Sequence, residues 1–277
     1  MASGDILICG LGLMGGSLAA ALTRAGRSVL LWHRRPAVAL EAERRGFGRM
    51  IPTLSEATMV ESAVVCTPVS TIPALARDIA ARSRAVITDV GSTKGGLLME
   101  LRALDEAGRF VGSHPMCGSH ATGLDHADAD LYRGRLVITT PTAKTDRKPL
   151  DLIEDLWRSV GARLVRLEPA LHDRAVAVAS HLPHLLSSAA AAGLSETAAP
   201  LAAGGFRDTT RVAAGDPALW ADILLANRAE VVPELARTLS RLEALRDALA
   251  AANGAAVQAW LEAGQAGRRR YESAQER

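Results

Sequence analysis

Four segments of the chain carry polar side chains of the kinds that move protons and hold anions. They are residues 88–95 (TDVGSTKG), 112–119 (GSHPMCGS), 180–184 (SHLPH) and 204–211 (GGFRDTTR). An imidazole can exchange a proton near neutral pH, and a guanidinium can bind a carboxylate through two hydrogen bonds. The ligand crevice of an open α/β sheet lies beyond the carboxyl ends of its strands, so we expect these segments to meet there.

A glycine-rich turn near the N-terminus is typical of a dinucleotide site. An apolar run, Ile6 to Cys9, leads directly into Gly10, Gly12 and Gly15 of GLGLMG, and a helix-forming run follows. The first glycine permits the turn, the second lets the backbone approach the pyrophosphate, and the third lets helix and strand pack closely. The cofactor-binding residues expected on this basis, with two at the end of a later strand, are Gly10, Gly12, Leu13, Met14, Gly15, Thr67 and Pro68.

The end of the second expected strand favours NADP over NAD. An acidic residue there would accept hydrogen bonds from the ribose 2′-hydroxyl of NAD. The chain instead reads His33, Arg34, Arg35, and arginine forks match a 2′-phosphate. Only three of the 32 basic residues are lysine, so a solvated arginine pair is the alternative interpretation. We therefore expect NADP, with NAD as the second candidate.

These residues must be positioned by an alternation of short β-branched runs and Ala/Leu-rich helical patterns over residues 1–167. Such alternation is typical of a parallel sheet with crossover helices. We expect strands at 5–9, 28–32, 62–67, 85–90, 109–111, 136–140 and 163–167, and helices at 15–25, 36–45, 70–82, 94–107 and 147–160.

Strand-like runs disappear after residue 167, and the rest of the chain is a series of helical patterns. The predicted fold class is α/β, with an N-terminal Rossmann-type dinucleotide-binding domain, residues 1–167, and an all-helical C-terminal domain, residues 168–277. The helical patterns at 174–191 and 219–252 are apolar over much of their surface, as subunit-packing helices are. We expect a substrate and dimerisation domain, and hence a homodimer.

Composition is that of an ordinary globular chain of 277 residues, with 48% hydrophobic and 22% charged residues. A net charge of +2, evenly scattered, argues against a nucleic-acid partner. The three cysteines lack the spacing of a disulfide framework or a zinc site. No signal peptide or membrane span is expected, so we predict a cytoplasmic protein.

Taken together and in order, the motifs resemble those of the prephenate/arogenate (cyclohexadienyl) dehydrogenase family of tyrosine biosynthesis. The resemblance runs from residue 5 to about residue 230 and includes GLGLMGGS at 10–17 and DPALW at 216–220. It implies oxidative decarboxylation of arogenate, prephenate or both, with hydride transfer to NAD(P)+, giving tyrosine or 4-hydroxyphenylpyruvate. Hydride leaves the ring carbon C4, and loss of carbon dioxide from C1 restores aromaticity.

The resemblance assigns catalytic roles to two residues. His114 matches the family's catalytic histidine and would take the C4 hydroxyl proton. Ser92 matches the active-site serine, although a serine there could also be the N-cap of the next helix. Lys94 is a weaker candidate, which could attract a phosphate or a substrate carboxylate.

The substrate pocket implied by the resemblance draws mainly on the helical domain. Arg211 matches the carboxylate-binding arginine. Two histidines, His181 and His184, lie three apart on an expected helix and match the family's pocket pair. A metal ion between them is not expected, because no further ligand has suitable spacing. The other pocket residues are Ser180, Ser119 and Trp220. Asp173 and Asp208 are expected only to hold arginines.

Other functions remain open at this stage. The same pocket could serve an aminated prephenate analogue of secondary metabolism, and a non-catalytic dinucleotide sensor could keep the fold. A β-hydroxyacid dehydrogenase would share the architecture but needs a lysine in the helical domain, and no lysine follows Lys148. The chain does not decide between arogenate and prephenate, and a slight preference for arogenate rests on the NADP expectation.

Overall fold

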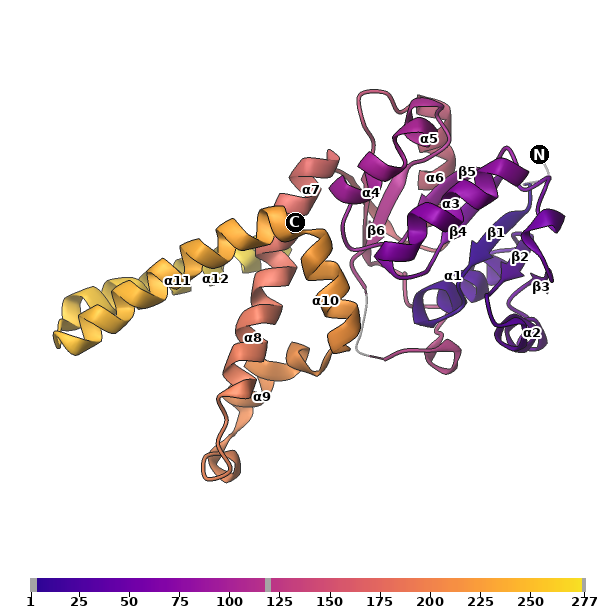
Figure 1. The fold of residues 1–277 in the computed structure, drawn as a ribbon. Helices are drawn as coiled ribbons and strands as arrows, with labels where there is room; N and C mark the ends of the chain where they lie inside the picture. The colour runs from indigo at the N-terminus through magenta and orange to yellow at the C-terminus, as the bar shows by residue number, and fades with distance from the viewer. Residues whose placement is uncertain (1–3, 118–120, 276–277) are drawn as a thin grey trace. The chain divides into compact units, whose positions relative to one another are not determined.

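The computed structural model describes residues 4–117 and 121–275, which form two compact units, Met1–Arg228 and Ala229–Arg277. The first unit contains a parallel sheet of five strands in the order β3-β2-β1-β4-β5 (Figure 1). These strands are β1 (Ile6–Cys9), β2 (Val29–Trp32), β3 (Arg49–Met50), β4 (Ser62–Val65) and β5 (Val86–Asp89). The strand order reverses direction between β1 and β4, so the ligand crevice is expected at the carboxyl ends of these two strands.

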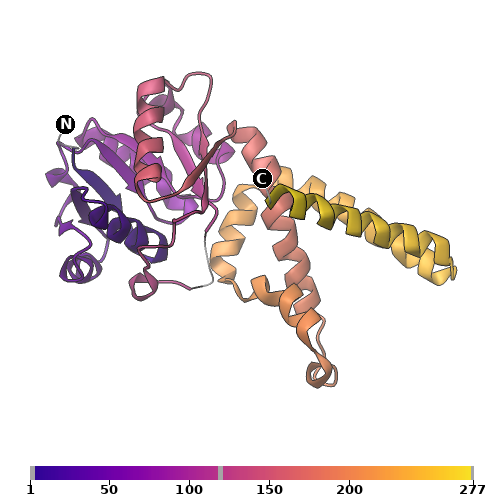
Figure 2. The same ribbon diagram turned by 180° about the vertical axis from the view of Figure 1, so that it is seen from behind.

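Both faces of this sheet are buried. Ile6 and Ile8 of β1 belong to one apolar core and Leu7 and Cys9 to another, as the twofold alternation of a strand requires. The first core packs against α1 (Leu13–Arg24), α2 (Pro36–Arg44) and α6 (Arg147–Ser159), and the second against α3 (Ile72–Arg82) and α4 (Gly95–Glu100). In Figure 1, α3 lies in front of the sheet, and the reverse view in Figure 2 brings α6 to the front. The central strands β1 and β2 are apolar along their whole length because both faces are covered.

A second sheet of three strands follows, in the order β6-β7-β8. β6 (Gly112–Pro115) pairs antiparallel with β7 (Leu136–Thr140), and β7 pairs parallel with β8 (Arg163–Arg166). The strand expected at 109–111 actually begins at Gly112, after Phe110 has formed a single bridge to Ile87. The helix expected over 94–107 is divided into α4 and α5 (Arg102–Glu106). His114 therefore lies within a strand rather than in a loop after one.

The remainder of the first unit is helical. It comprises α7 (Pro169–Val176), a π-helical turn η4 (Ala177–His181), α8 (Leu182–Ala192), α9 (Gly204–Thr210), a 3-10 turn η6 (Arg211–Ala214) and α10 (Pro217–Ala226). Proline at the first position of α7 and of α10 suits a helix start, where the missing N–H would have no partner. At α10, the Asp216 carboxylate also accepts hydrogen bonds from the N–H groups of Ala218 and Leu219. A break at Asn227 divides the helix expected over 219–252.

The second unit consists of α11 (Arg228–Ala250, most of which lies in this unit) and α12 (Gly254–Gln275), joined by a short turn. The two helices lie side by side in both views, and the Trp260 indole donates a hydrogen bond to the Arg241 carbonyl, at 3.0 Å. Helices alone follow β8 in the described residues. The predicted fold class, a Rossmann-type domain followed by a helical domain, is confirmed.

One continuous helical stretch, Pro169–Ala192, is long and apolar enough to cross a membrane by length and composition. Its buried residues include His172, Asp173 and His181, which form hydrogen bonds to side chains or backbone of other elements. A helix with such polar contacts is satisfied inside a folded domain, so we interpret the stretch as a core and packing helix.

Candidate active site

The β1–α1 turn has the shape that a dinucleotide needs. Gly10 has φ +93°, and a Cβ there would lie 2.7 Å from the Cys66 carbonyl oxygen, while a Cβ on Gly15 would overlap the Gly10 carbonyl. The protein's own backbone therefore requires glycine at both positions. Gly12 differs, because a Cβ there would meet nothing within 4 Å. Open space beside Gly12 is what close approach of a pyrophosphate would use.

The start of α1 offers free donors to that space. Gly12 is the N-cap residue, and no side chain caps the helix. The first N–H groups of α1 therefore point out of the helix with the positive end of its dipole, which favours a phosphate. Leu13 and Met14, both partly exposed, flank this point. Thr67 and Pro68 follow β4 on the other side of the strand-order reversal, where the Thr71 hydroxyl donates to Thr67 Oγ1 at 2.9 Å.

The end of β2 presents positive charge. Arg34 and Arg35 are exposed, and within residues 4–117 and 121–275 neither forms an ion pair. His33 Nδ1 accepts a hydrogen bond from the Arg35 backbone N–H at 3.0 Å. Burial, with the two arginines, lowers the pKa of His33, so its ring is neutral at pH 7. The guanidinium groups of Arg34 and Arg35, which no described residue pairs, are thus available to bind a phosphate.

His114 lies on β6 with only 8% of its surface exposed. Its Nδ1 is 2.9 Å from Nε2 of His172, and Nδ1 of His172 is 2.8 Å from Oδ1 of Asp173. Burial, with Lys94 and the neighbouring histidines His172 and His181, lowers the pKa of His114 well below its usual value. The ring is therefore neutral at pH 7, as a general base must be.

Asp89, at the end of β5, connects the strand to the following loop and to β6. It forms a buried ion pair with Lys94, and it accepts backbone hydrogen bonds from Gly91 at 2.8 Å and from Ser113 at 3.1 Å. Burial lowers the pKa of Lys94, and Asp89 partly offsets this effect. The expectation that Lys94 attracts a ligand is not supported by this geometry, because only 2% of Lys94 is exposed and its charge is already paired.

Ser92 is half-buried in the loop between β5 and α4. The alternative of Ser92 as a helix N-cap is wrong, because α4 starts with Lys94 as its N-cap and has no side-chain cap from its own loop. The two Asp173 oxygens instead accept the backbone N–H groups of Lys94 and Gly95, each at 2.7 Å. Among the described residues the Ser92 hydroxyl makes no hydrogen bond, so it is available to a ligand.

His181 ends the π-helical turn, a distortion that often marks functional sites. Its Nδ1 is 3.1 Å from the amide nitrogen of Asn227, which also donates to the Asp173 carbonyl at 2.8 Å. Burial lowers the pKa of His181 to about 4. Lys94, His172 and Asp173 all act electrostatically on either His114 or His181, so the two imidazoles belong to one polar cluster.

His184 is stacked on Trp220, with ring centroids 3.6 Å apart and an angle of 12° between the rings. Gly215 permits this contact, because a Cβ there would lie 2.5 Å from Trp220 Nε1 and 3.2 Å from His184 Cε1. His184 Nδ1 is buried and has no partner in the described part of the chain. Trp220 also contacts His181 edge to face, at 6.2 Å between centroids. The structure thus brings both predicted histidines against the predicted tryptophan.

Arg211 begins η6, which packs against α8, the helix that carries His184. Its side chain is exposed, and no described residue forms an ion pair with it. Ser180 is half-buried on the π-helical turn. Arg207 and Asp208 pair with each other at 3.0 Å, as expected for Asp208. Ser119 lies outside the described residues.

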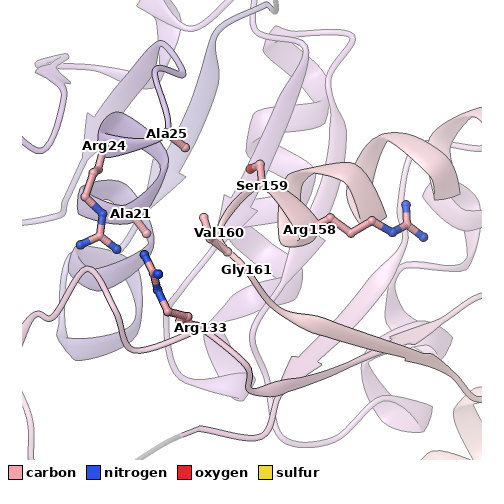
Figure 3. Close-up of a pocket in the computed structure, with 8 residues that line it drawn as sticks. All are labelled: Ala21, Arg24, Ala25, Arg133, Arg158, Ser159, Val160 and Gly161. Carbon is pink, nitrogen blue, oxygen red and sulfur yellow. The ribbon is translucent and has the colours of Figure 1, made fainter.

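A separate hollow lies at the C-terminal ends of α1 and α6 (Figure 3). Arg24 and Arg133 approach each other there, and Arg158 points away from them. Both Arg24 and Arg133 bind Asp130, and Arg158 binds Glu154 and Asp155, so the charges are already paired. None of the predicted site residues lines this hollow. Among the described residues, no group of three or more metal-ligating side chains is gathered at any place.

Sequence reasoning missed the residues that support the imidazoles. His172 and Asn227 were not singled out, Asp89 was named only as part of the segment 88–95, and Asp173 was expected only to hold an arginine. The one available signal was polarity, because His172, Asp173 and Asn227 interrupt otherwise apolar helical patterns. A buried polar side chain needs a partner, but the sequence does not say which partner it has.

Comparisons with known proteins agree with the motifs. The family description "Prephenate dehydrogenase, nucleotide-binding domain" matches residues 18–166, and "Prephenate dehydrogenase, dimerization domain" matches residues 168–263. A prephenate dehydrogenase of Bacillus subtilis is 32% identical over 87% of this chain and 69% of its own length. A cyclohexadienyl dehydrogenase of Zymomonas mobilis is 32% identical over 90% of this chain and 89% of its own.

The fold agrees as well. The crystal structure of a prephenate dehydrogenase from A. aeolicus, in complex with hydroxyphenyl propionate and NAD+, superposes with a TM-score of 0.87 at 30% identity, covering 98% of this chain and 99% of that one. The chain therefore belongs to the prephenate dehydrogenase family of nicotinamide-dependent oxidoreductases, as the ordered motifs predicted.

Proposed function

We propose that this protein oxidises and decarboxylates arogenate, prephenate or both, with His114 as the general base and NADP as the preferred hydride acceptor. The observation that carries the proposal is the state of His114. Its ring is buried and neutral, its Nδ1 lies 2.9 Å from Nε2 of His172, and none of the described residues forms a hydrogen bond with its Nε2. Such an imidazole can take a proton from a hydroxyl.

The reaction removes a hydride from C4 and carbon dioxide from C1, and the C4 oxygen gives up a proton and later regains one. His114 takes the proton from the C4 hydroxyl as C4 becomes a carbonyl carbon. A nicotinamide dinucleotide held at the β1–α1 turn, by Gly10, Gly12 and Gly15, would supply the acceptor for the hydride from C4. The C1–carboxylate bond then breaks, carbon dioxide leaves, and its electron pair completes the aromatic ring, while the C4 oxygen regains a proton from the protonated His114. The Ser92 hydroxyl, unengaged by the described residues, would hydrogen-bond the same C4 oxygen or orient His114.

The substrate's negative charge would be met from the helical part of the first unit. The unpaired Arg211 would bind a carboxylate, and His181, with Ser180 beside it, would donate a hydrogen bond to an oxygen. The stacked His184 and Trp220 would bound the ring of the substrate. Ser119 belongs to the same proposed pocket by the family's motif.

The preference for NADP rests on Arg34 and Arg35, exposed and unpaired among the described residues, and on the absence of a carboxylate from positions 33–35. A 2′-phosphate would receive charge-assisted hydrogen bonds from one or both guanidiniums. Titrating the protein with NADP and NAD tests this directly. Weaker binding of NADP than of NAD would assign the cofactor to NAD.

We also infer a cytoplasmic homodimer formed through the helical domain, residues 168–277. Large apolar side chains are exposed on its helices, among them Val178 and Leu186 on the long apolar stretch and Leu225 on α10. Exposed apolar surface of this kind is typical of a subunit interface. Sedimentation at micromolar concentration should give a mass close to 58 kDa, about twice the chain mass of 29.1 kDa.

The experiment that tests the function gives purified protein prephenate or arogenate with NAD or NADP, in all four combinations, and follows the absorbance of the reduced nicotinamide. We expect a signal with at least one pair, and the strongest with NADP. No signal in any combination would favour the aminated analogue or the sensor, and these two are separated by offering the aminated analogue as substrate.

A further inference from the structure

The oxygens of Asp173 next to His172 and Asn227 have fixed roles, because an ionised carboxylate and a backbone carbonyl can only accept hydrogen bonds, and these roles determine which ring nitrogen of each neighbouring histidine carries a proton. We propose that Asp173 and Asn227, with His172, are positioning residues that hold His114 as a hydrogen-bond acceptor and His181 as a hydrogen-bond donor toward the substrate. The proposal deepens the function proposed above, and it rests on that function for the role of His114.

The first chain of bonds starts at the Asp173 carboxylate. Burial raises the pKa of Asp173, but hydrogen bonds from His172 and from the backbone of Gly95 and Lys94 outweigh this and lower it, so the group is ionised. An ionised carboxylate can only accept hydrogen bonds. At 2.8 Å, the bond from His172 therefore has its proton on Nδ1 of His172.

The same chain continues to His114. In the proposed arrangement the other ring nitrogen of His172, Nε2, has a lone pair. That lone pair lies 2.9 Å from Nδ1 of His114, so His114 must carry its own proton on Nδ1. Nε2 of His114 is then the unprotonated ring nitrogen, and it is the atom that can take a proton from the substrate hydroxyl. Carboxylate, imidazole and catalytic imidazole thus form one line of donors and acceptors.

The second chain of bonds starts at the backbone carbonyl of Asp173. A carbonyl only accepts, so the Asn227 atom that lies 2.8 Å from it is the amide nitrogen. The same nitrogen lies 3.1 Å from Nδ1 of His181 and has a second hydrogen to donate. His181 therefore accepts at Nδ1 and, with its pKa lowered to about 4 by burial, carries its single proton on Nε2 at pH 7.

Asp173 thus acts on both imidazoles with opposite results. Its carboxylate, through His172, makes Nε2 of His114 an acceptor, and its backbone carbonyl, through Asn227, makes Nε2 of His181 a donor. The two states match the two needs of the reaction. The C4 hydroxyl must give up a proton, which requires an acceptor, and an anionic or carbonyl oxygen of the substrate must be held, which requires a donor. A second acceptor in place of His181 would repel the substrate's oxygens.

The direct test measures the ring protons of the whole protein by nitrogen NMR, with 15N-labelled histidine, at pH 7.5 and without ligand. We expect Nδ1–H rings for His114 and His172 and an Nε2–H ring for His181. Removing each ring in turn, by H114N, H172Q and H181N, assigns the signals. An Nε2–H ring at His114, which a doubly protonated His172 would produce, overturns the first chain of bonds. An Nδ1–H ring at His181 overturns the second.

Two variants test the consequence for turnover. The variant H172Q breaks the hydrogen-bonded chain from His114 to Asp173. We expect kcat to fall by about 10- to 100-fold, which is part of the usual contribution of a general base, while KM for the dinucleotide stays within about twofold.

The variant N227D replaces the amide by a carboxylate, which cannot donate a hydrogen bond, so His181 must turn its Nδ1–H toward it. We expect KM for the substrate to rise by about tenfold, which corresponds to the loss of one hydrogen bond of about 1.4 kcal/mol.

Matched controls use the same changes on exposed residues. His126 is exposed on a 3-10 turn, and Asn253 is exposed in the turn between α11 and α12, so H126Q and N253D should leave kcat and KM unchanged. Equal effects in the controls, or unchanged kinetics in both test variants, would overturn the proposal. The NMR result does not depend on turnover. Correct ring states in a protein that turns over neither acid would therefore refute the proposed function while leaving the hydrogen-bond network established.

Discussion

Replacing Gly12 by alanine separates binding of the cofactor from stability of the fold. A Cβ on Gly12 meets no atom within 4 Å, and the residue has φ −86° and ψ −157°, an extended conformation that alanine adopts readily. The variant should therefore fold normally. Because alanine has fewer unfolded conformations than glycine, we expect a gain of about 0.4–1 kcal/mol in the free energy of unfolding. For a chain of this size that corresponds to roughly 1–4 °C in Tm.

Dinucleotide affinity should change in the opposite direction. The new methyl group would occupy the open space beside the start of α1, where the pyrophosphate must approach the backbone. Loss of one charge-assisted hydrogen bond to phosphate costs about 1.5–3 kcal/mol. We therefore expect Kd for NADP and for NAD to rise roughly 10- to 100-fold. Calorimetric titration with each dinucleotide, and thermal unfolding without ligand, measure the two effects separately.

The matched control is Gly15→Ala. A Cβ there would overlap the Gly10 carbonyl, so this variant should lose stability, by about 1–3 kcal/mol as for an overpacked core. If Gly12→Ala instead bound both dinucleotides as tightly as the unaltered protein, the pyrophosphate would not lie beside Gly12. A marked fall in the Tm of Gly12→Ala would refute the steric argument itself.

Other predictions concern the polar cluster. Lys94→Met should lower the free energy of unfolding by about 3–5 kcal/mol, because it leaves the Asp89 charge buried and unpaired. The double variant Lys94→Met, Asp89→Asn should recover part of this loss in chemical unfolding, and no recovery would refute the ion-pair account. His114→Ala should lower kcat by about 10²–10⁴-fold while Kd for the dinucleotide stays nearly unchanged; full activity would remove His114 as the base. Arg211→Ala should raise substrate KM far more than it lowers kcat, and an unaltered KM would place the carboxylate elsewhere. His181 has a pKa of about 4 in the folded protein, so between pH 6.5 and pH 4 the unfolded chain binds a proton there that the folded protein does not bind. The contribution of His181 to the free energy of unfolding is therefore complete above pH 6.5 and is lost as the pH falls toward 4. A Tm series should show this fall, and His181→Gln should reduce its steepness.

The sequence predicted the fold and the family because the signals for both are local. Glycine spacing after an apolar strand, strand and helix periodicity, and the change to helices after residue 167 can each be read within a short window. Gly10 and Gly15 are required by backbone contacts inside one turn, so their meaning does not depend on distant residues. The short strand β3, Arg49–Met50, was missed because two residues give no periodicity.

The residues that position the candidate site could not be predicted from such local signals. Asp173 caps α4, a helix that starts 78 residues earlier in the chain, and Asn227 meets His181 across 46 residues. Such pairings depend on how elements pack, and residue types alone do not specify them. For the same reason Ser92 was interpreted as a possible N-cap and Lys94 as a ligand contact, whereas Asp173 caps the helix and Asp89 pairs with the lysine. The boundaries 1–167 and 168–277 and the roles of the site residues remain predictions.

The central claim is that hydride leaves C4 of a cyclohexadienyl acid as carbon dioxide leaves C1. The most direct measurement supplies prephenate and arogenate carrying deuterium at C4 and analyses the reduced dinucleotide by mass, with carbon dioxide counted in the same reaction. We predict one deuterium in each reduced dinucleotide and one carbon dioxide for each, with the rate greatly reduced in His114→Ala. Reduced dinucleotide without deuterium, or reduction without release of carbon dioxide, would contradict the account.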